Sequence, residues 1–597
     1  MSESPFVYET GQQEARRMWW TILIGTLICS VSVLWLPTTY SEADDLGALM
    51  ILAGEDGFAA APEVPFLSFS LNQLFVQLYQ WFPGFSWYGV LLVMTQSAGL
   101  SLLFYCLLFK LKQTPWLGMV FPFFLIFSLY SLLTVTFTQA CLTLLFAVAA
   151  AISCRASLND WPVLTRRGLA CLLLWALLWR WKFGLICLVF FVPLAIVQFS
   201  QLRKYFRLLA MVLGLLAVDR FIHHQWASPE WHQYMEFYET RAKLFDMPAG
   251  RAGENLELAL QSAGWSAEDY QLIRESWMLY DERLTNQASM TRFIEAVGNH
   301  GGASVIEQIE GNLRNNARLL YAFLPISLAI MILGIRSWAE DPQWQRKSIA
   351  LLCLLGPVLF LAYFRLVPRI LVPIFLYGFT LLNLWTESEL SESKSGKLSA
   401  WNQIIKLTPM HFLAFLPIVI GLGTSCLVLQ QQWKDTREKR AAFTASETLV
   451  EELNQPTTLL RTQVSALPGW EGIHPYQRMN QGRDLRIIPS GWQVGSPRYF
   501  NIIRELGYES GSQLISRFAS STDDGEYFVQ RFTRTRGVVE LYSEQWLAYL
   551  KRHHPDRSFE NPEVNVIALG SRGQKLSLLK LMPASDEEIT LESLLPE

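Results

Sequence analysis

Charged residues are scarce in this chain. They make up 17% of its 597 residues, whereas 51% of the residues are hydrophobic and 13% are aromatic. Soluble domains carry charge on about a quarter of their residues, so this composition favours an integral membrane protein. The net charge is −3, and the polar segments lack the basic face that would neutralise nucleic-acid phosphates. Nucleic acid is therefore excluded as a partner.

The chain also lacks cysteine in its polar segments, because all eight cysteines lie in or beside apolar runs. A disulfide framework is therefore excluded. The sequence contains no G-x-S-x-G turn, no G-x-x-x-x-G-K-[ST] loop and no G-x-G-x-x-G after a strand, so no motif supports a serine hydrolase, an ATPase or a dinucleotide-binding enzyme. The histidines at 223–224, 232 and 553–554 do not follow the spacing of metal ligands.

Long apolar runs dominate the rest of the chain. A bilayer core about 30 Å thick needs about 20 apolar residues per helix, and flanking aromatic residues allow somewhat shorter segments. The runs predict eleven membrane-spanning helices, at 18–36, 87–109, 116–134, 138–154, 168–181, 183–200, 206–222, 317–335, 348–364, 370–386 and 408–429. The predicted fold class is therefore mainly α, a polytopic transmembrane helical protein.

Lysine and arginine are distributed unevenly between the short loops, which indicates the orientation of the helices. With the N-terminus inside, the inner loops hold basic residues such as Arg16, Arg17, Lys110 and Lys112. This orientation places three polar segments outside, the loops at 37–86 and 223–316 and the tail. We therefore predict a transmembrane domain over 1–429 and a soluble extracytoplasmic domain over 430–597. The basic run WKDTREKR opposes an outer tail, but long translocated domains largely ignore the charge rule.

The outer segments have structure of their own. Apolar residues at helical spacing in 71–82 predict a helix lying in the membrane interface, with Tyr79 and Trp81 at headgroup level. The 223–316 loop is expected to be mostly helical. The tail alternates helical windows (SPRYFNIIRELG, SEQWLAYLKRHH) with β-like runs (LRIIPS, EYFVQRF, VVELYS, NVIALGS), which predicts a small α/β or α+β domain.

The stretch PTTYSEADDLGALMILAGEDGF at 37–58 carries five acidic residues just outside the first predicted span. Ser41-x-x-Asp44 has the form of a capping box, which explains Glu42 and Asp44 because the helix dipole favours acids in the first turn. It does not explain Glu55 and Asp56 at the opposite end, where the dipole disfavours negative charge. A solvated structural role and a functional role are both open for these acids, since carboxylates beside a low-dielectric surface are costly to ionise.

Positive charge also occurs on the outer side, where the orientation predicts little of it. Arg180 and Lys182 lie at the turn between the fifth and sixth spans, and Arg365 and Arg369 lie at the turn between the ninth and tenth. Snorkelling to the interface explains many such residues. Four cations opposite an acidic loop also suit a site for a membrane-anchored phosphate, because guanidinium groups bind phosphate oxygens bidentately.

Both features fit one reaction. Transfer of a sugar from a lipid-linked donor needs a base that takes the proton of the acceptor hydroxyl at the membrane surface. It also needs cations or a metal to stabilise the charge on the departing phosphate. The acidic pair can supply the base, and the outer arginines and lysine can supply the clamp.

The order of these features resembles the GT-C superfamily of polytopic membrane glycosyltransferases. Its members have a cytoplasmic N-terminus, an outer loop with an acidic pair after the first span, many further spans and a C-terminal periplasmic domain. More narrowly, ADDLGALMILAG, PFLSFSLNQLFVQLY and FPGFSWYG look like a bacterial group of O-antigen-type and exopolysaccharide glucosyltransferase-like membrane proteins. The segments TFTQACLTLL, LLWRWKFG and SGWQVGSPRYFNII continue this resemblance along most of the chain.

The resemblance implies roles for individual residues. The catalytic base of the superfamily maps onto Asp44, with Asp45 as its partner. Some members hold a divalent metal, Mg or Mn, with these acids and a second outer acid, whereas others are metal-independent, so the metal stays open. The second acids available are Glu55, Asp56 and Asp246, and the phosphate clamp maps onto Arg180, Lys182, Arg365 and Arg369. The chain departs from the commoner pattern at Gln139, where the resemblance leads us to expect arginine.

The leading hypothesis is an inverting GT-C glycosyltransferase of a bacterial inner membrane, surrounded by membrane lipids. It would move a sugar from a polyprenyl-phosphate donor onto a glycan or lipid acceptor at the periplasmic face. The alternatives are a transporter or flippase for a lipid-linked glycan, which needs charged or broken helices near the membrane midplane, and a scaffold subunit whose tail binds a partner. An outer-face cavity that joins Asp44 and Asp45 to Arg180 and Arg369 would support the enzyme, whereas acids separated from those cations would support the scaffold.

Overall fold

The structure is a computed structural model, and it is mainly helical, which confirms the predicted class at that level. It describes residues 5–111, 117–154, 161–192, 196, 202–245, 256–276, 281–282, 284–298, 305–325, 327–328, 367–385, 409–452, 457–461, 470–478, 485–488, 491–514, 526–532, 549, 552–553, 559–569 and 574–583. The predicted span at 348–364 and the site residues Asp246 and Arg365 lie outside these residues.

Long helices occupy most of the predicted spans. They are α1 (Pro5–Ser32), α4 (Trp87–Leu111), α5 (Leu117–Leu133), α6 (Phe137–Ser153), α7 (Val163–Trp179), α8 (Trp181–Cys187) with the 3-10 turn η2 (Leu188–Phe191), α10 (Leu202–Trp226), α18 (Pro368–Trp385) and α20 (Pro409–Glu452). Among the described residues, Trp87–Leu108 is long and apolar enough by itself to cross a bilayer. Shorter apolar helices occur at Phe121–Leu133, Phe137–Ser153, Trp181–Phe191 and Pro368–Leu381.

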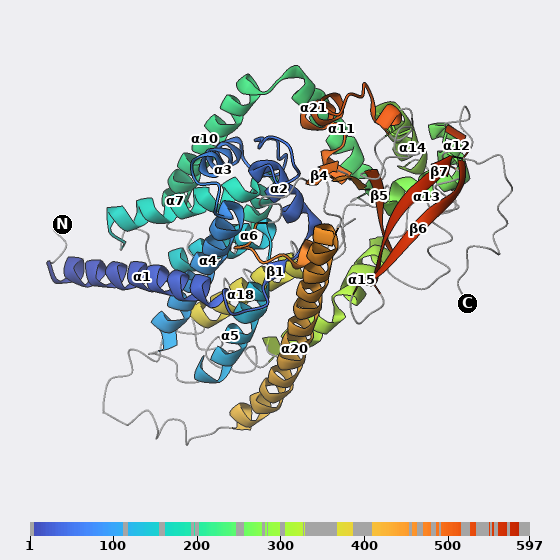
Figure 1. Cartoon of the computed structure of the whole chain (residues 1–597). Coiled ribbons are helices and arrows are strands. Elements are labelled where there is room, and N and C mark those ends of the chain that lie inside the picture. The colour runs from blue at the N-terminus through green and yellow to red at the C-terminus, as the bar shows by residue number, and fades with distance from the viewer. Residues whose placement is uncertain are drawn as a thin grey trace.

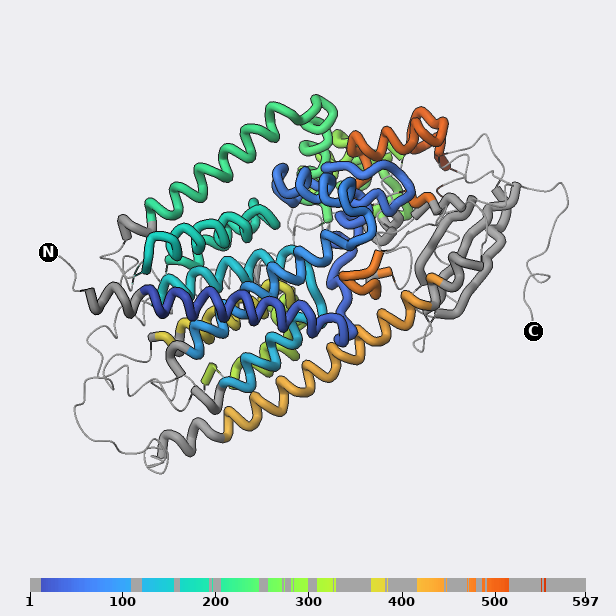
Figure 2. Tube along the Cα trace, turned by 60° about the vertical axis from the view of Figure 1, so that its left-hand side comes forward, coloured from blue at the N-terminus to red at the C-terminus, as the bar shows by residue number. Residues whose placement is uncertain are grey.

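Helix α6 forms the centre of the bundle. Its residues from Phe137 to Ile152 are all buried, and it packs against α4, α7 and α18. Gly99 of α4 allows the closest of these approaches, because a Cβ there would lie 2.8 Å from the backbone nitrogen of Leu144. Small residues bring helix backbones together in this way where apolar surroundings give no driving force of their own. Figures 1 and 2 show α1 and α4 side by side at the edge of this bundle.

Two short helices lie over one end of the bundle, the end predicted to face outward, α2 (Ala43–Ala53) and α3 (Phe69–Trp81). The predicted helix at 71–82 is confirmed as α3, which Ser68 caps by accepting from the backbone N–H of Leu71. Trp81 is 65% exposed, whereas Tyr79 is buried inside the protein, and the placement of this helix in a membrane interface stays a prediction. The Tyr79 hydroxyl accepts from the backbone N–H of Tyr88 at 3.0 Å, which fixes α3 to the start of α4.

The predicted capping box at the start of α2 is wrong. Its N-cap is Glu42, which makes no side-chain cap hydrogen bond. The reason lies in a two-residue parallel ladder between β1 (Thr39–Tyr40) and β2 (Thr134–Val135). This ladder continues into Ser41, whose backbone N–H donates to Val135, and the helix starts only after it. Gly54 ends α2 in the left-handed conformation that favours glycine, with φ of 68°.

The loop at 223–316 is mostly helical in its described residues, as predicted. Its helices are α11 (Pro229–Phe245), α12 (Leu256–Ala263), α13 (Ala267–Ser276), α14 (Gln287–Gly298) and α15 (Val305–Asn315). Leu260 of α12 and Phe293 of α14 belong to one buried apolar cluster together with Val494, Tyr499 and Ile503 of the tail. The outer loop and the tail therefore share a core.

The tail forms a five-stranded mixed sheet in the order β4-β3-β5-β7-β6. The strands are β3 (Thr457–Arg461), β4 (Leu485–Ile488), β5 (Glu526–Phe532), β6 (Phe559–Leu569) and β7 (Gln574–Pro583). Strand β3 is parallel to both neighbours, and β5, β7 and β6 pair antiparallel. Three predicted strands are confirmed as β4, β5 and β6. The run VVELYS lies outside the described residues, and the sequence patterns did not predict β3 and β7.

The tail has further short elements, η5 (Trp470–Gly472), η6 (Gly491–Gln493) and α21 (Pro497–Glu505), the last of which confirms a predicted helix. Helix α20 connects the tail to the bundle without a break. This helix has 44 residues and continues to Glu452, well past the predicted domain boundary between 429 and 430. Figure 1 shows α20 as the long helix that runs from the side of the bundle toward the sheet.

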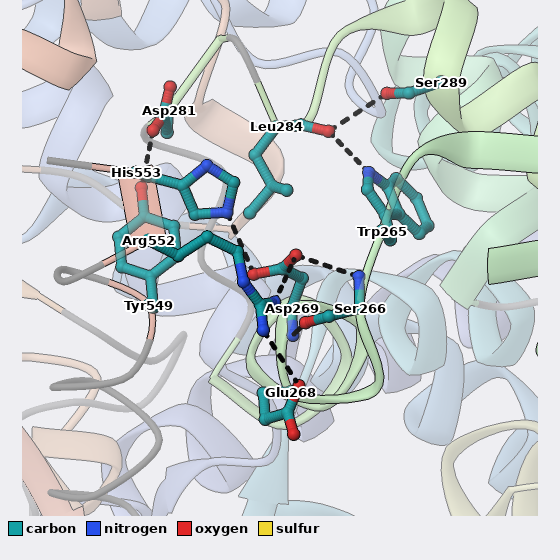
Figure 3. Close-up of polar contacts among 10 residues, drawn as sticks. All are labelled: Trp265, Ser266, Glu268, Asp269, Asp281, Leu284, Ser289, Tyr549, Arg552 and His553. Carbon is teal, nitrogen blue, oxygen red and sulfur yellow. Dashed lines mark hydrogen bonds and ion pairs between the residues drawn. The ribbon is translucent and has the colours of Figure 1, made fainter. Parts of the chain in front are cut away.

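A polar cluster joins the outer helices to the tail (Figure 3). Asp269, near the start of α13, accepts from the backbone N–H of Ser266 at 2.9 Å and pairs with His553 at 3.1 Å and Arg552 at 3.3 Å. Burial raises the pKa of Asp269, but its hydrogen bonds to His553 and Ser266 outweigh this effect and hold the net pKa below the ordinary value. The carboxylate form is therefore favoured in the folded protein.

We predict that Asp269→Asn loosens this contact, because it removes the charge that pairs with His553 and Arg552. The expected loss of local stability is about 1–3 kcal/mol, and it would be measured as faster amide hydrogen exchange in α13. The contact is expected to persist at neutral pH and to weaken only below about pH 4, because a carboxyl with a depressed pKa loses its stabilising effect as it takes up a proton. Glu268→Gln is the comparison, because the Glu268 pair with Arg552 is long, at 3.6 Å, and about half exposed, so it is expected to contribute little. Equal exchange in the two variants would contradict the prediction.

Candidate functional site

Asp45 is the structural centre of the outer acidic loop. It is fully buried, and its Oδ1 accepts from the hydroxyl of Tyr88 at 2.8 Å and from the backbone N–H of Phe137 at 2.9 Å. One carboxylate thereby joins α2 to the starts of α4 and α6. Burial is the largest effect on this group and raises its pKa from the ordinary 3.8 to about 7, against the opposing effect of its hydrogen bonds.

Asp44 lies one position earlier, in the first turn of α2, and is partly exposed. Its negative charge is one of the causes that raise the pKa of Asp45, which shows that the two carboxylates are close. Solvent reaches Asp44 but not Asp45. Of the two predicted catalytic residues, Asp44 is therefore the one that a substrate can reach, and Asp45 holds the helix that carries it.

Two of the predicted cations contact residues that adjoin this acidic pair. Arg369, at the start of α18, forms an ion pair with Glu42, the N-cap of the helix that carries Asp44. The guanidinium of Arg180 lies over the ring of Phe137 at 4.8 Å from its centroid, and the backbone N–H of Phe137 is bonded to Asp45. Helices α2, α6, α7 and α18 thus bring two acids and two cations to one end of the bundle.

Lys182 is engaged elsewhere. Its ammonium group pairs with Glu239 of α11 at 2.6 Å, and both side chains are about half exposed. The neighbouring Trp181 ring carries the guanidinium of Arg220 at 4.3 Å. The structure therefore places Lys182 at the contact between the bundle and the outer helices, while Arg365 and Asp246 are outside the described residues.

Glu55 and Asp56, the second acidic pair, are buried in ion pairs with the tail. Glu55 Oε1 accepts from Arg478 Nε at 2.5 Å. Both carboxylate oxygens of Asp56 accept from Arg498 Nη2, at 2.7 and 2.8 Å. Burial raises the pKa of Asp56, and the guanidinium of Arg498 opposes this shift. These pairs explain why acids stand at the end of α2 that the helix dipole disfavours.

The segment after η5 packs into the same region. Pro475 accepts from the hydroxyl of Ser86 at 2.7 Å, and the Tyr476 hydroxyl donates to Ser30 at 2.8 Å. Gly89 makes this approach possible, because a Cβ at that position would lie 1.7 Å from the Pro475 oxygen. At the middle of α2, a Cβ on Gly47 would lie 2.7 Å from the Gln493 amide nitrogen. The tail therefore covers the outer loop rather than forming a separate body.

Arg478 and Arg498 bind the second acidic pair, and the sequence patterns did not predict either of them. Their partners lie 423 and 442 positions away along the chain, so local spacing carries no signal for the pairing. A partial signal existed, because Arg498 belongs to the SGWQVGSPRYFNII segment that carried part of the resemblance. Gln139, the departure from that pattern, donates to the Ser131 carbonyl at 3.0 Å inside the bundle.

The acids do not form a divalent metal site in the part of the chain that the structure describes. No group of three or more His, Cys, Asp or Glu side chains there could hold a metal ion. Glu55 and Asp56, two of the candidate second ligands, already accept from guanidinium groups whose positive charge would oppose a cation.

Comparison with models of protein families gives no match to this chain, and comparison with curated protein sequences gives none either. Evidence for a function therefore comes from the arrangement of the acids and cations described above.

We predict that Arg498→Met weakens the attachment of the tail by about 3–5 kcal/mol, because it leaves Asp56 buried without its partner. Thermal unfolding and limited proteolysis of the purified full-length chain would measure this effect. The double variant Asp56→Leu/Arg498→Met removes the stranded charge and is expected to recover much of the loss. Arg504→Met is the matched control, since this arginine lies on the exposed side of the same helix, α21. Equal protease sensitivity of Arg498→Met and Arg504→Met would contradict a structural role for the pair.

The raised pKa of Asp45 predicts a pH dependence of stability. The folded state holds the proton up to about pH 7, whereas the unfolded chain releases it near the ordinary value of 3.8. The folded protein therefore binds more protons in this window, and its stability falls as the pH rises through it. Asp45→Asn is expected to flatten this part of the curve of stability against pH. At pH 8 the variant is expected to unfold at a higher temperature than the wild type. An unchanged slope between pH 4 and 7 in this variant would contradict the prediction.

Proposed function

We propose that this chain is a membrane glycosyltransferase of the GT-C type. It transfers a sugar from a polyprenyl-phosphate donor to a glycan or lipid acceptor at the outer, periplasmic face of a bacterial inner membrane. The observation that carries the proposal is the set of contacts around the start of α2, where Phe137 bonds to Asp45 and lies under Arg180, and Arg369 pairs with Glu42, two positions before Asp44. A base and two cations in one place are what the reaction requires.

Exposed apolar side chains on the bundle support a polytopic arrangement. On α1, Leu23, Leu27 and Ile28 are each at least 60% exposed, and α10 exposes Phe221 to 65%. Helix α20 exposes Leu416 and Leu427 to a similar degree. Contiguous apolar surface of this kind is unfavourable in water, and the acyl chains of a bilayer would cover it. Arg17 and Trp20 near the N-terminal end of α1 suit the inner membrane interface.

The proposed reaction is a direct displacement. The Asp44 carboxylate takes the proton of an acceptor hydroxyl, whose oxygen forms a bond to the anomeric carbon of the donor sugar. The bond between that carbon and the phosphate oxygen breaks, and the lipid phosphate leaves with the bonding electron pair. Arg180 and Arg369 stabilise the negative charge that develops on this phosphate. Glu42 is the ground-state partner of Arg369, so the donor phosphate replaces or shares this carboxylate contact.

The transporter alternative finds less support in the described helices. A path for a charged headgroup through the bundle needs ionisable or broken backbone positions near the midplane. Between Trp87 and Leu108, and along α5 and α6, the sequence contains no Asp, Glu, Lys or Arg. The buried polar groups there are amides and hydroxyls, some of which bond to one another, such as Gln96 to Ser131 at 2.7 Å.

The test of the proposal is the variant Asp44→Asn, alone and with Asp45→Asn. Loss of the base is expected to reduce sugar transfer by about 10²–10⁴-fold while the protein remains folded, as judged by its expression and thermal unfolding. The measurement is the amount of the transferred sugar in the glycans of cells that carry each variant. Glu230→Gln, at an exposed position in α11, is the control and is expected to transfer normally. Wild-type transfer by a folded Asp44→Asn/Asp45→Asn protein would refute the mechanism.

A further inference from the structure

A groove between α1 and α4 lies away from the candidate site, along α1 from Glu14 to Ile28. It has a volume of about 700 Å³, within the range of about 300–1,000 Å³ that is usual for small-molecule sites. Its walls are largely apolar and include Trp20, Ile24 and Ile28 of α1 and Phe104 and Leu108 of α4. The side chains of Trp20, Ile24 and Ile28 are at least half exposed, so the groove opens on the outward face of the bundle.

The two helices are in close contact along the floor of this groove. Gly25 is essential to that contact, because a Cβ there would lie 2.5 Å from the Ser101 Oγ. The Tyr105 hydroxyl donates to the backbone oxygen of Glu14 at 3.5 Å, which holds the helices together at the far end. The groove is therefore a built feature of the helix pair. From Arg17 to Ile28 it follows α1 for about 16 Å, close to the thickness of one leaflet of a bilayer core, about 15 Å.

The charged residues that line the groove are Glu14 and Arg17, and they have opposite signs. They are three positions apart, which places them on the same face of α1, at the end of the groove toward the N-terminus. Thr21 adds a hydroxyl one turn further along, and the remaining lining is apolar. The groove thus has a cation and an anion at its end toward the N-terminus, and its remaining length is largely apolar.

We infer that this groove binds a membrane glycerophospholipid with a zwitterionic headgroup that ends in a primary ammonium, of the phosphoethanolamine kind. Arg17 binds the phosphate, the Glu14 carboxylate accepts from the ammonium, and one acyl chain lies between Ile24, Ile28 and Leu108. Opposite charges at the end of the groove toward the N-terminus select this headgroup over a purely anionic one, and a primary ammonium, unlike a quaternary one, can donate hydrogen bonds to a carboxylate. This inference rests on the membrane placement in the proposed function and is independent of its chemistry.

The experiment uses the full-length protein, stripped of lipid in detergent and then supplied with phosphatidylethanolamine, phosphatidylcholine or phosphatidylglycerol. Native mass spectrometry counts bound lipids, and thermal unfolding measures stabilisation. Phosphatidylethanolamine is expected to bind at least tenfold more tightly than the other two. Arg17→Gln is expected to weaken this binding about tenfold or more, and Ile24→Trp, which fills the groove, is expected to abolish it.

Arg16→Gln is the matched control, because Arg16 is the exposed neighbour of Arg17 and does not line the groove. Glu14→Gln tests the headgroup directly, since it is expected to move the preference from phosphatidylethanolamine to phosphatidylglycerol. Equal weakening by Arg16→Gln and Arg17→Gln, equal binding of the three lipids by the wild type, or a dimer joined through α1 that excludes lipid would each overturn the inference. Asp44→Asn is expected to bind the lipid normally, so failure of the catalytic proposal and failure of this one are distinguishable.

Discussion

Helix α2 carries buried carboxylates at both of its ends, and the cost of burying them determines much of the surrounding structure. A carboxylate removed from water without a partner is strongly destabilising. At the start of α2, Asp45 is compensated by hydrogen bonds from Tyr88 and Phe137. At its end, Glu55 and Asp56 are compensated by Arg478 and Arg498. The helix bundle supplies the first set of partners and the tail supplies the second.

This arrangement makes the outer loop part of one packed unit. The bundle holds the N-terminal end of α2, the tail holds its C-terminal end, and Gly47 lets the tail approach the middle of the helix. Asp44 projects from a helix that is fixed at both ends, which is the kind of support that catalytic groups need for accurate placement. The tail thereby contributes to the site region although none of its residues is assigned a chemical role.

Helix α1 connects the two surfaces that we interpret functionally. Its C-terminal end contacts the tail through Ser30 and the adjoining Val33, the latter by a contact of 3.0 Å to His474. Its N-terminal half lines the groove with Arg17 and Glu14. One face of the helix packs on small residues of α4, while its apolar outward face remains available to lipid. A single helix thus serves for tail attachment and bundle packing, and its exposed apolar face suits the membrane placement that we propose.

Most of the correct predictions of helices and strands came from local sequence patterns. Long apolar runs predicted the long helices, helical spacing of apolar residues predicted α3, and short β-like runs predicted β4, β5 and β6. Strands β3 and β7 escaped prediction because their pairing, not their own pattern, stabilises them in the sheet. The capping box failed for a similar reason, since the ladder between β1 and β2 displaces the start of α2.

The sequence by itself determined the mainly helical class and marked Asp44, Asp45, Arg180 and Arg369 as residues of unusual charge in their surroundings. The tertiary structure decided which of them meet. It placed Arg180 over Phe137 and paired Arg369 with Glu42, both next to the acidic pair. It also paired Lys182 with Glu239, and Glu55 and Asp56 with arginines of the tail. The spacing of apolar residues indicates which face of a segment is buried, because that spacing involves only residues close together in the sequence. The partner of a buried charge can lie more than 400 positions away, and only the folded chain shows which one it is.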